Sequence, residues 1–197
     1  TPRDAAAMEP QARMMMEVCW DAIEDAGLPF ESLRQERVAV IIGHTAEDFS
    51  RERIGVLGED AAMRSLDVRT AVGYARAAIS GRISHLLDLR GPSLTVDTAC
   101  SSSLYATHQA CQSLWTGESR MALAGGVNLF LTPEGSLALS RSGMMASDGH
   151  CKAFDARADG FVRAEGAGAV LLRPLDEALE NGDRIYAVIR GSGISAD

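Results

Sequence analysis

The spacing of apolar residues predicts helices and short strands in alternation along the first half of the chain. Residues 10–26 read as a helix, because Pro10 suits a first turn, Gly27 suits the position after the last turn, and Met15 and Cys19 recur on one face. The same reasoning gives the other elements of this half: a buried strand at 38–43, a polar loop with one short helix at 44–67, a mostly helical stretch at 69–87 with a break near Gly81, and a strand at 93–96.

The second half continues the alternation. Residues 100–116 read as a helix that carries no charged side chain, so we expect it to be buried on all sides. The remaining expected elements are a strand at 121–127, a helical turn at 135–140, a strand at 167–173, a helix at 175–181 that Gly182 ends, and a final strand at 185–190. Several of these strands are apolar on both faces. The pattern predicts an α/β layered fold around a largely buried sheet.

Composition narrows the class of protein. The chain has 197 residues, a formal net charge of −8 and 46% hydrophobic residues, which are ordinary values for a globular domain. A sequence pI near 5.0 argues against partners that need a basic surface, so we expect neither nucleic acid nor membrane among them. The four cysteines form no CxxC or other zinc-ligand spacing, and no leader-like or membrane-spanning segment is evident. We therefore expect a cytoplasmic protein with reduced thiols and no bound metal or cofactor.

The sharpest chemical feature is Cys100, which follows the predicted strand at 93–96 and opens the uncharged helix. A thiol at a helix N-terminus faces unpaired backbone N–H groups and the positive end of the helix dipole. Both favour the thiolate, and the same N–H groups could hold an oxyanion that develops on a thioester carbonyl. The alternative is that Cys100 is a small buried apolar residue and that Ser101 to Ser103 simply cap the helix. Spacing alone leaves both interpretations open.

The other cysteines and the histidines give weaker signals. Cys19 and Cys111 fall inside predicted helices, where a structural thiol is expected, and Cys151 falls in a glycine-rich loop. A nucleophilic cysteine usually needs a proton acceptor, most often histidine. The candidates are His44, His85, His108 and His150. None has a local pattern that marks a catalytic base, so the chain offers a nucleophile without an evident partner.

A family resemblance rests on several segments in the same order. Residues 96–104 read Val-Asp-Thr-Ala-Cys-Ser-Ser-Ser-Leu after Asp-Leu-Arg-Gly-Pro-Ser-Leu-Thr at 88–95, which resembles the active-site segment of β-ketoacyl synthase (ketosynthase) domains. Three further segments continue the likeness: 9–27, 124–128 and 151–163. Within the family the chain resembles modular type I polyketide synthases. Only the stretch around residues 45–68 has no counterpart in the pattern.

The resemblance implies a thiolase-like fold of α-β-α layers, here mostly the N-terminal half with part of the linkage to a second half. It implies that Cys100 accepts an acyl chain and that its backbone N–H contributes to an oxyanion hole. A malonyl-type extender then undergoes decarboxylative Claisen condensation with that thioester, which makes the parent enzyme an acyltransferase. Substrates would arrive on the phosphopantetheine of acyl carrier proteins, no cofactor would be bound by the chain, and the full domain would form a homodimer.

Departures from the family pattern limit these expectations. Family domains carry two catalytic histidines in downstream motifs that do not occur in residues 1–197, and Ala12 and Ala164 replace usual family residues. We therefore expect residues 1–197 to be a partial ketosynthase domain that does not condense on its own, and none of its four histidines to inherit the base role. Other readings are the ketosynthase of a fatty-acid synthase, a non-elongating ketosynthase that only passes acyl chains on, and a structural dimerisation module.

Overall fold

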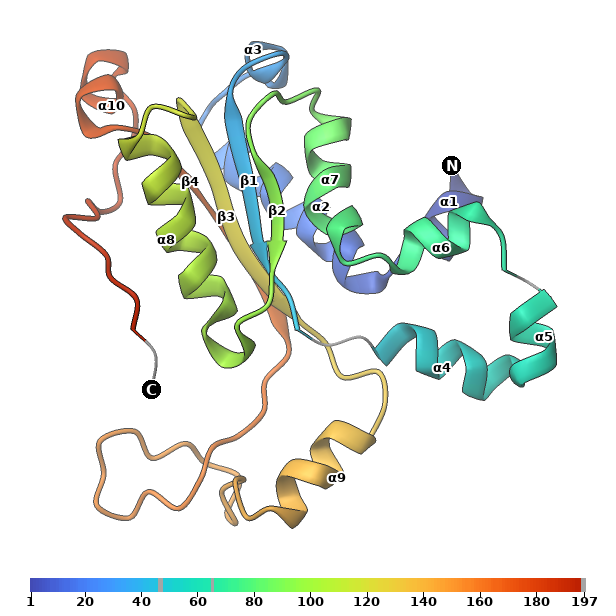
Figure 1. Ribbon diagram of the computed structural model, residues 1–197. Coiled ribbons are helices and arrows are strands. Elements are labelled where there is room, and N and C mark those ends of the chain that lie inside the picture. The colour runs from blue at the N-terminus through green and yellow to red at the C-terminus, as the bar shows by residue number, and fades with distance from the viewer. Residues whose placement is uncertain (46–47, 65, 196–197) are drawn as a thin grey trace.

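A computed structural model of the chain describes residues 1–45, 48–64 and 66–195. Its centre is a four-stranded sheet in the order β2-β1-β3-β4 (Figure 1). β1 (Val38–Gly43) pairs in parallel with β2 (Ser93–Val96) and with β3 (Met121–Asn128), whereas β4 (Gly166–Leu172) runs antiparallel to β3. All four strands were predicted within one residue of their bounds, because each apolar run ends at glycine or at polar residues.

Helices surround the sheet and extend from it (Figure 1). The helices before the second strand are α1 (Pro2–Ala7), α2 (Pro10–Asp25), α3 (Phe30–Leu33), α4 (Asp48–Leu57), α5 (Glu59–Arg64), α6 (Val68–Tyr74) and α7 (Ala77–Leu86). Those after it are the 3₁₀ turn η1 (Ala99–Ser101), α8 (Ser102–Trp115), α9 (Glu134–Arg141) and α10 (Leu175–Asn181).

Alternation along the strands divides the core into two sides. Val38, Val40 and Ile42 point toward α2 and α7 and form the larger apolar cluster with residues of those helices. Ala39 and Ile41 point the other way and pack against small side chains of α8. The sheet therefore lies between two helical layers, as the apolar strand pattern predicts. Burial of β1 is complete along its length.

Two predicted helical boundaries were wrong. The stretch at 44–67 contains α4 and α5 rather than a single short helix, apart from residues 46, 47 and 65, which lie outside the described residues. The break in the helical stretch at 69–87 falls at Ala75 and Arg76, not near Gly81. Gly81 stays inside α7 because a helix tolerates one glycine when its other residues favour the helix and pack against the sheet.

Two further predictions were wrong for reasons of burial and pairing. α8 is not buried on all sides, because only the face toward β1 and β3 packs, while Leu104 is 76% exposed and Trp115 54% exposed. Residues 185–190 form no strand in the described chain, where they lie outside the sheet (Figure 1). A strand exists only with a hydrogen-bonded neighbour, so an apolar pattern alone does not create one.

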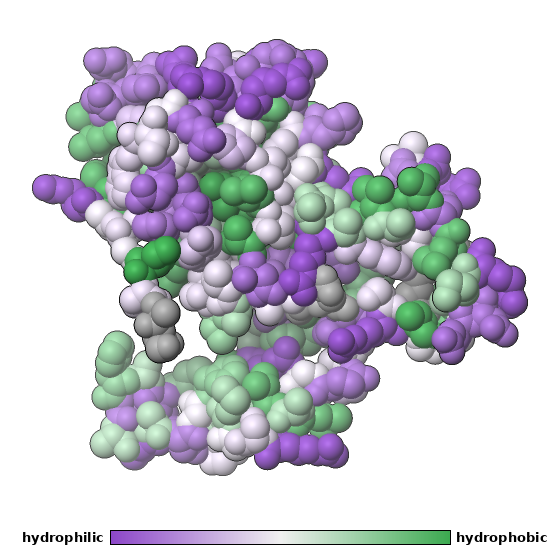
Figure 2. Space-filling view, in the orientation of Figure 1, coloured by the Kyte–Doolittle hydropathy of each residue, from purple (hydrophilic) through white to green (hydrophobic). Residues whose placement is uncertain are grey.

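Two parts extend beyond the sheet and its helices. Helices α4, α5 and α6 form an arm at the right of Figure 1, and Figure 2 shows apolar side chains gathered on it. The exposed large apolar residues of this arm and its connections are Ile54, Val56, Leu57, Met63, Leu66, Val68 and Val72. The second part, which we call the lower segment, is α9 with the loop at 142–165, and it hangs below the sheet in Figure 1.

Candidate active site

Cys100 lies at the edge of the sheet where the three parallel strands end. β2 ends at Val96, the 3₁₀ turn η1 spans Ala99–Ser101, and α8 begins at Ser102. In open α/β sheets, ligands bind at this carboxyl edge of the strands. Cys100 is exposed. The predicted strand, turn and helix are therefore confirmed, with one refinement: the cysteine sits on the 3₁₀ turn that precedes the helix.

The serines after Cys100 bind the turn rather than the first N–H groups of the helix. Ser101 Oγ donates to the Thr98 carbonyl at 2.8 Å, and Ser102 Oγ donates to the Ala99 carbonyl at 2.6 Å. Ser101 is the N-cap of α8 and makes no side-chain capping bond. Within the described part of the chain, the backbone N–H of Cys100 has no protein acceptor. A donor without a protein acceptor in the described chain thus lies in the same residue as the exposed thiol, as an oxyanion-binding group would.

Glycines let the first turn of α8 press against the ends of the strands. A Cβ on Gly43 would lie 2.5 Å from the backbone of Ser102 and Ser103, and one on Gly126 would lie 2.7 Å from the Ser103 Cβ. Both distances are far below van der Waals contact. The two strand ends therefore approach the helix main chain closely because they carry no side chain there, and this contact fixes where η1 and Cys100 sit above the sheet.

A charged pair flanks the turn. Asp97 accepts a hydrogen bond from the Ala99 backbone N–H at 3.0 Å, and Arg76 Nη1 lies 2.5 Å from its second oxygen. The Ala99 hydrogen bond, with help from Arg76 and Thr45, holds the pKa of Asp97 below its usual value. The Asp97 carboxylate is therefore ionised and paired at neutral pH.

The remaining cysteines differ from Cys100 in burial. Cys19 is fully buried, and desolvation raises the pKa of its thiol to about 12. Burial also raises the pKa of Cys111. Both positions agree with the predicted structural role. Cys151 is exposed, and its sulfur accepts a hydrogen bond from the Val162 backbone N–H at 3.2 Å.

The four histidines lie in separate places, and no hydrogen bond joins any of them to Cys100 in the described residues. His44 is buried directly after β1, where its Nε2 lies 3.0 Å from Gln11 Nε2. His85 is in the last turn of α7. His108 on α8 lies 2.9 Å from Ser192 Oγ, and His150 contacts Asp148 in the lower segment.

Sequence reasoning did not single out Arg76, Thr45 or Asp97 as neighbours of the turn. The local spacing could have indicated Asp97, since the side chain of an aspartate commonly accepts a hydrogen bond from the backbone N–H two residues later in a turn. No local signal points to Arg76, which is 21 residues from Asp97 in the sequence.

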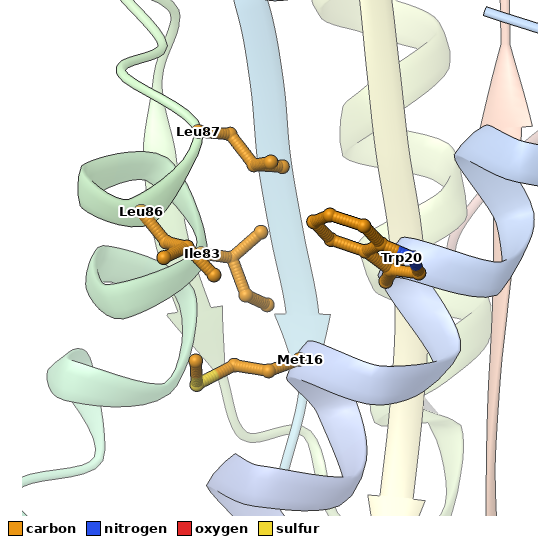
Figure 3. A pocket seen from close by; sticks show the side chains of 5 residues that line it. All are labelled: Met16, Trp20, Ile83, Leu86 and Leu87. Carbon is orange, nitrogen blue, oxygen red and sulfur yellow. The ribbon is translucent and has the colours of Figure 1, made fainter. Parts of the chain in front are cut away.

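Other candidate sites are poor. Met16 and Trp20 of α2 face Ile83, Leu86 and Leu87 around a small apolar pocket (Figure 3), on the opposite side of the sheet from α8. Among residues 1–45, 48–64 and 66–195, no three His, Cys, Asp or Glu side chains gather closely enough to hold a metal ion. In the same residues no helix combines the length and apolarity that crossing a bilayer requires.

Comparison with known proteins gives a consistent picture. The sequence profile described as "Beta-ketoacyl synthase, N-terminal domain" matches residues 1–178. Over all its residues the chain is 48% identical to one phenolphthiocerol/phthiocerol polyketide synthase protein of Mycobacterium tuberculosis, and 49% identical to a second protein of the same synthase and organism. It spans only 9% and 12% of the lengths of these two relatives.

Solved structures agree with the sequence matches. The ketosynthase from module 6 of the bacillaene synthase of Bacillus subtilis superposes with a TM-score of 0.81 at 39% identity, over 94% of this chain and 30% of that one. An oxazolomycin ketosynthase domain from Streptomyces albus also has a TM-score of 0.81, at 36% identity, over 92% of this chain and 30% of that one. These matches confirm the predicted thiolase-like layering of helices and sheet.

Proposed function

The chain belongs to the β-ketoacyl synthase family, and from this premise we propose that it forms the acyl-accepting part of a ketosynthase domain in a modular polyketide synthase. The proposal rests mainly on one observation. The thiol of Cys100 is exposed on a tight turn at the start of α8, beside a backbone N–H that no protein group occupies among the described residues. Similarity to polyketide synthases supports this pathway over fatty-acid synthesis.

In the first proposed step, the Cys100 thiolate attacks the carbonyl carbon of an acyl thioester carried by an acyl carrier protein. The new C–S bond forms, the carbonyl oxygen gains negative charge, and the Cys100 backbone N–H donates to that oxygen. The bond to the carrier's phosphopantetheine sulfur then breaks, and the departing thiolate takes up the proton that Cys100 released. The small residues Ala99 and Ser101 beside the sulfur leave room for the incoming thioester.

In the second proposed step, a malonyl-type extender on a carrier protein loses CO2, and its carbanion attacks the Cys100 thioester. A C–C bond forms, the C–S bond to Cys100 breaks, and Cys100 leaves as a thiolate, while the product is a 3-oxoacyl thioester on the carrier. The four histidines of this chain are not assigned to decarboxylation, since the structure gives none of them a contact with Cys100 in its described part. We therefore expect residues 1–197 alone to accept acyl chains without condensing them.

The proposed partners are acyl carrier proteins and a second copy of the full domain. Residues 1–197 are proposed as part of a larger ketosynthase domain, since they match 30% of each solved relative. The exposed apolar side chains on α8 and on the arm formed by α4, α5 and α6 support this, because such surfaces are commonly covered by further protein.

A thiol-acylation experiment tests the role of Cys100. The purified full-length protein is incubated with an acyl N-acetylcysteamine thioester, digested, and analysed by peptide mass spectrometry. We expect the acyl mass on the peptide that contains Cys100, its loss in Cys100→Ala, and its retention in Cys151→Ala, which removes a second exposed thiol. Equal acylation of wild type and Cys100→Ala would contradict the proposal.

The same protein distinguishes an elongating from a non-elongating ketosynthase. Once Cys100 is acylated, a malonyl-loaded carrier protein is added and CO2 release is measured. A condensing enzyme releases CO2 and frees Cys100, whereas a non-elongating one keeps the acyl group on Cys100 without CO2 release.

A further inference from the structure

Residue 99, directly before the nucleophile of the proposed function, has an unusual backbone conformation. Ala99 has φ +53°, in the left-handed region that L-residues other than glycine, asparagine and aspartate seldom adopt. Such a conformation persists when surrounding groups hold it, and it occurs often where geometry matters for function. The side chains that hold Ala99 therefore bear on the geometry of Cys100.

Both polar backbone groups of Ala99 are held by side chains. Its N–H donates to Asp97 Oδ1 at 3.0 Å, and its carbonyl accepts both the Ser102 hydroxyl, at 2.6 Å, and the Ser102 backbone N–H. The Ala99 carbonyl and the Cys100 N–H belong to one planar trans peptide, so they point in opposite directions. Fixing the carbonyl thereby fixes the direction of the Cys100 N–H, which is the donor that the proposed function assigns to the oxyanion.

Asp97 is itself anchored by two other segments. Thr45, which follows β1, donates to Asp97 Oδ1 at 3.1 Å. Arg76, at the start of α7, donates from Nη1 to Asp97 Oδ2 and from Nη2 to the Thr45 carbonyl at 3.3 Å. The Asp97 carboxylate thus joins the end of β1, the start of α7 and the cysteine turn. Its pairing with Arg76 also compensates a negative charge close to where the oxyanion would form.

We propose that Asp97, anchored by Arg76, is a positioning residue that aims the Cys100 backbone N–H at the carbonyl oxygen of the acyl thioester. The proposal rests on the proposed function of Cys100 and deepens it. Asp97 acts only through the turn and transfers no proton. Its removal should slow acyl transfer, which develops an oxyanion, and should affect simple alkylation of the same sulfur much less, since alkylation by iodoacetamide develops none.

The test measures two reactions of Cys100 in the full-length protein. Acylation by an acyl N-acetylcysteamine thioester and alkylation by iodoacetamide are followed separately by mass spectrometry of the Cys100 peptide. In Asp97→Ala we expect the maximal acylation rate to fall by about tenfold or more, because a misaimed group costs rate steeply. The alkylation rate should change by less than about twofold, because the thiol itself remains exposed.

Conservative variants and a matched control sharpen the result. Asp97→Asn keeps an oxygen that can accept the Ala99 N–H and should restore most of the acylation rate. Ser102→Ala removes the side-chain bond to the Ala99 carbonyl and keeps the one from the Ser102 backbone N–H. It should lower the acylation rate selectively as well, which keeps the test decisive even where Asp97→Ala fails to fold. Asp67→Ala removes an aspartate that accepts the Thr70 backbone N–H at the start of α6, and should change neither rate.

Two outcomes would overturn the proposal: acylation at the wild-type rate in Asp97→Ala and Ser102→Ala, or losses of acylation and alkylation in equal proportion. Failure of the proposed function looks different, because wild-type Cys100 would then be alkylated normally and not acylated at all.

Discussion

At the scale of single residues, Gln11 joins three segments beneath the edge of the sheet that carries Cys100. It is fully buried, its Nε2 donates to Glu9 at 3.1 Å, and its Oε1 accepts the Leu129 backbone N–H at 3.0 Å. Its amide also contacts His44 directly after β1. A buried amide with polar partners on both its oxygen and its nitrogen fixes the relative position of those segments.

The buried carboxyl of Glu9 gives a pH prediction. Desolvation raises its pKa above the ordinary value of 4.5, so between pH 4.5 and its folded pKa the native state keeps a proton that the unfolded chain has released. The free energy of unfolding should therefore fall as pH rises through that window. Glu9→Gln removes this loss, so the variant should gain stability relative to wild type as pH rises above 4.5, measured by urea denaturation at a series of pH values.

Glu17→Gln, which removes an exposed carboxylate from α2, is the matched control for loss of charge. A stability difference between Glu9→Gln and wild type that stays constant with pH would contradict the assigned cause.

The same scale shows what the sequence can and cannot predict about the site. The position of Cys100 between a strand end and a helix start was predicted from its own neighbours, since both are local features. The structural roles of Cys19 and Cys111 were likewise predicted from their helical positions. The contribution of Arg76 could not be predicted from the sequence. Its contact with Asp97 arises only when α7 packs beside β2, and no sequence pattern encodes that packing.

At the scale of elements, the packing of α8 on the strand ends depends on Gly43. In Gly43→Ala the new Cβ would meet backbone atoms of Ser102 and Ser103 at 2.5 Å, which cannot move without shifting α8. We expect a loss of about 3 kcal/mol in the free energy of unfolding, typical of overpacking a tight contact. Denaturant titration checks it.

Gly81→Ala is the matched control for this prediction. Gly81 lies inside α7 with no atom within 4 Å of a new Cβ. We expect it to stabilise the protein by about 1 kcal/mol, since alanine favours the helix. Equal effects of the two substitutions would contradict the close approach of α8.

Elements were predicted best where local pattern and burial agree. The apolar run at 38–43 is buried along its whole length and was predicted in full. Residues 185–190 have the same kind of pattern but no neighbouring strand in the described chain, so they form none. The arm was mispredicted because α4 and α5 carry polar and apolar residues without one dominant face, and periodicity then gives no clear signal.

At the scale of the whole molecule, the layered sheet and the lower segment are stabilised differently. The sheet buries two apolar clusters. The lower segment buries few side chains and is tied together by polar contacts, with Lys152 between Asp148 at 2.8 Å and Asp159 at 2.6 Å. Ser147 also donates to Asp159, and Arg163 stacks on Phe130. Its loop conformation thus depends on charge more than on apolar burial.

Because of this contrast, we expect the lower segment to open locally while the sheet and its helices stay folded. Lys152→Met should raise the rate of tryptic cleavage after Arg157 by about tenfold, since local opening governs proteolysis of a loop. The thermal midpoint of the sheet and its helices should stay nearly unchanged. Arg13→Met, which removes an exposed cation from α2, is the control, and loop cleavage at the wild-type rate in Lys152→Met would contradict the role of the cluster.

Acid should act on the same contacts. The hydrogen bond from Lys152 lowers the pKa of Asp159 to about 2. The stabilisation that this contact gives the lower segment is therefore present above pH 3.8 and is lost as pH falls toward 2.

The close approach of Gly43 and Gly126 to α8 also has a consequence for the design of variants. The thiol is placed by main-chain contacts beneath it, while the side chains on the outward face of α8, such as Leu104, contribute little to that placement. Variants that are meant to change the reactivity of Cys100 should therefore keep glycine at positions 43 and 126, because a side chain at either position would displace the turn that carries the thiol.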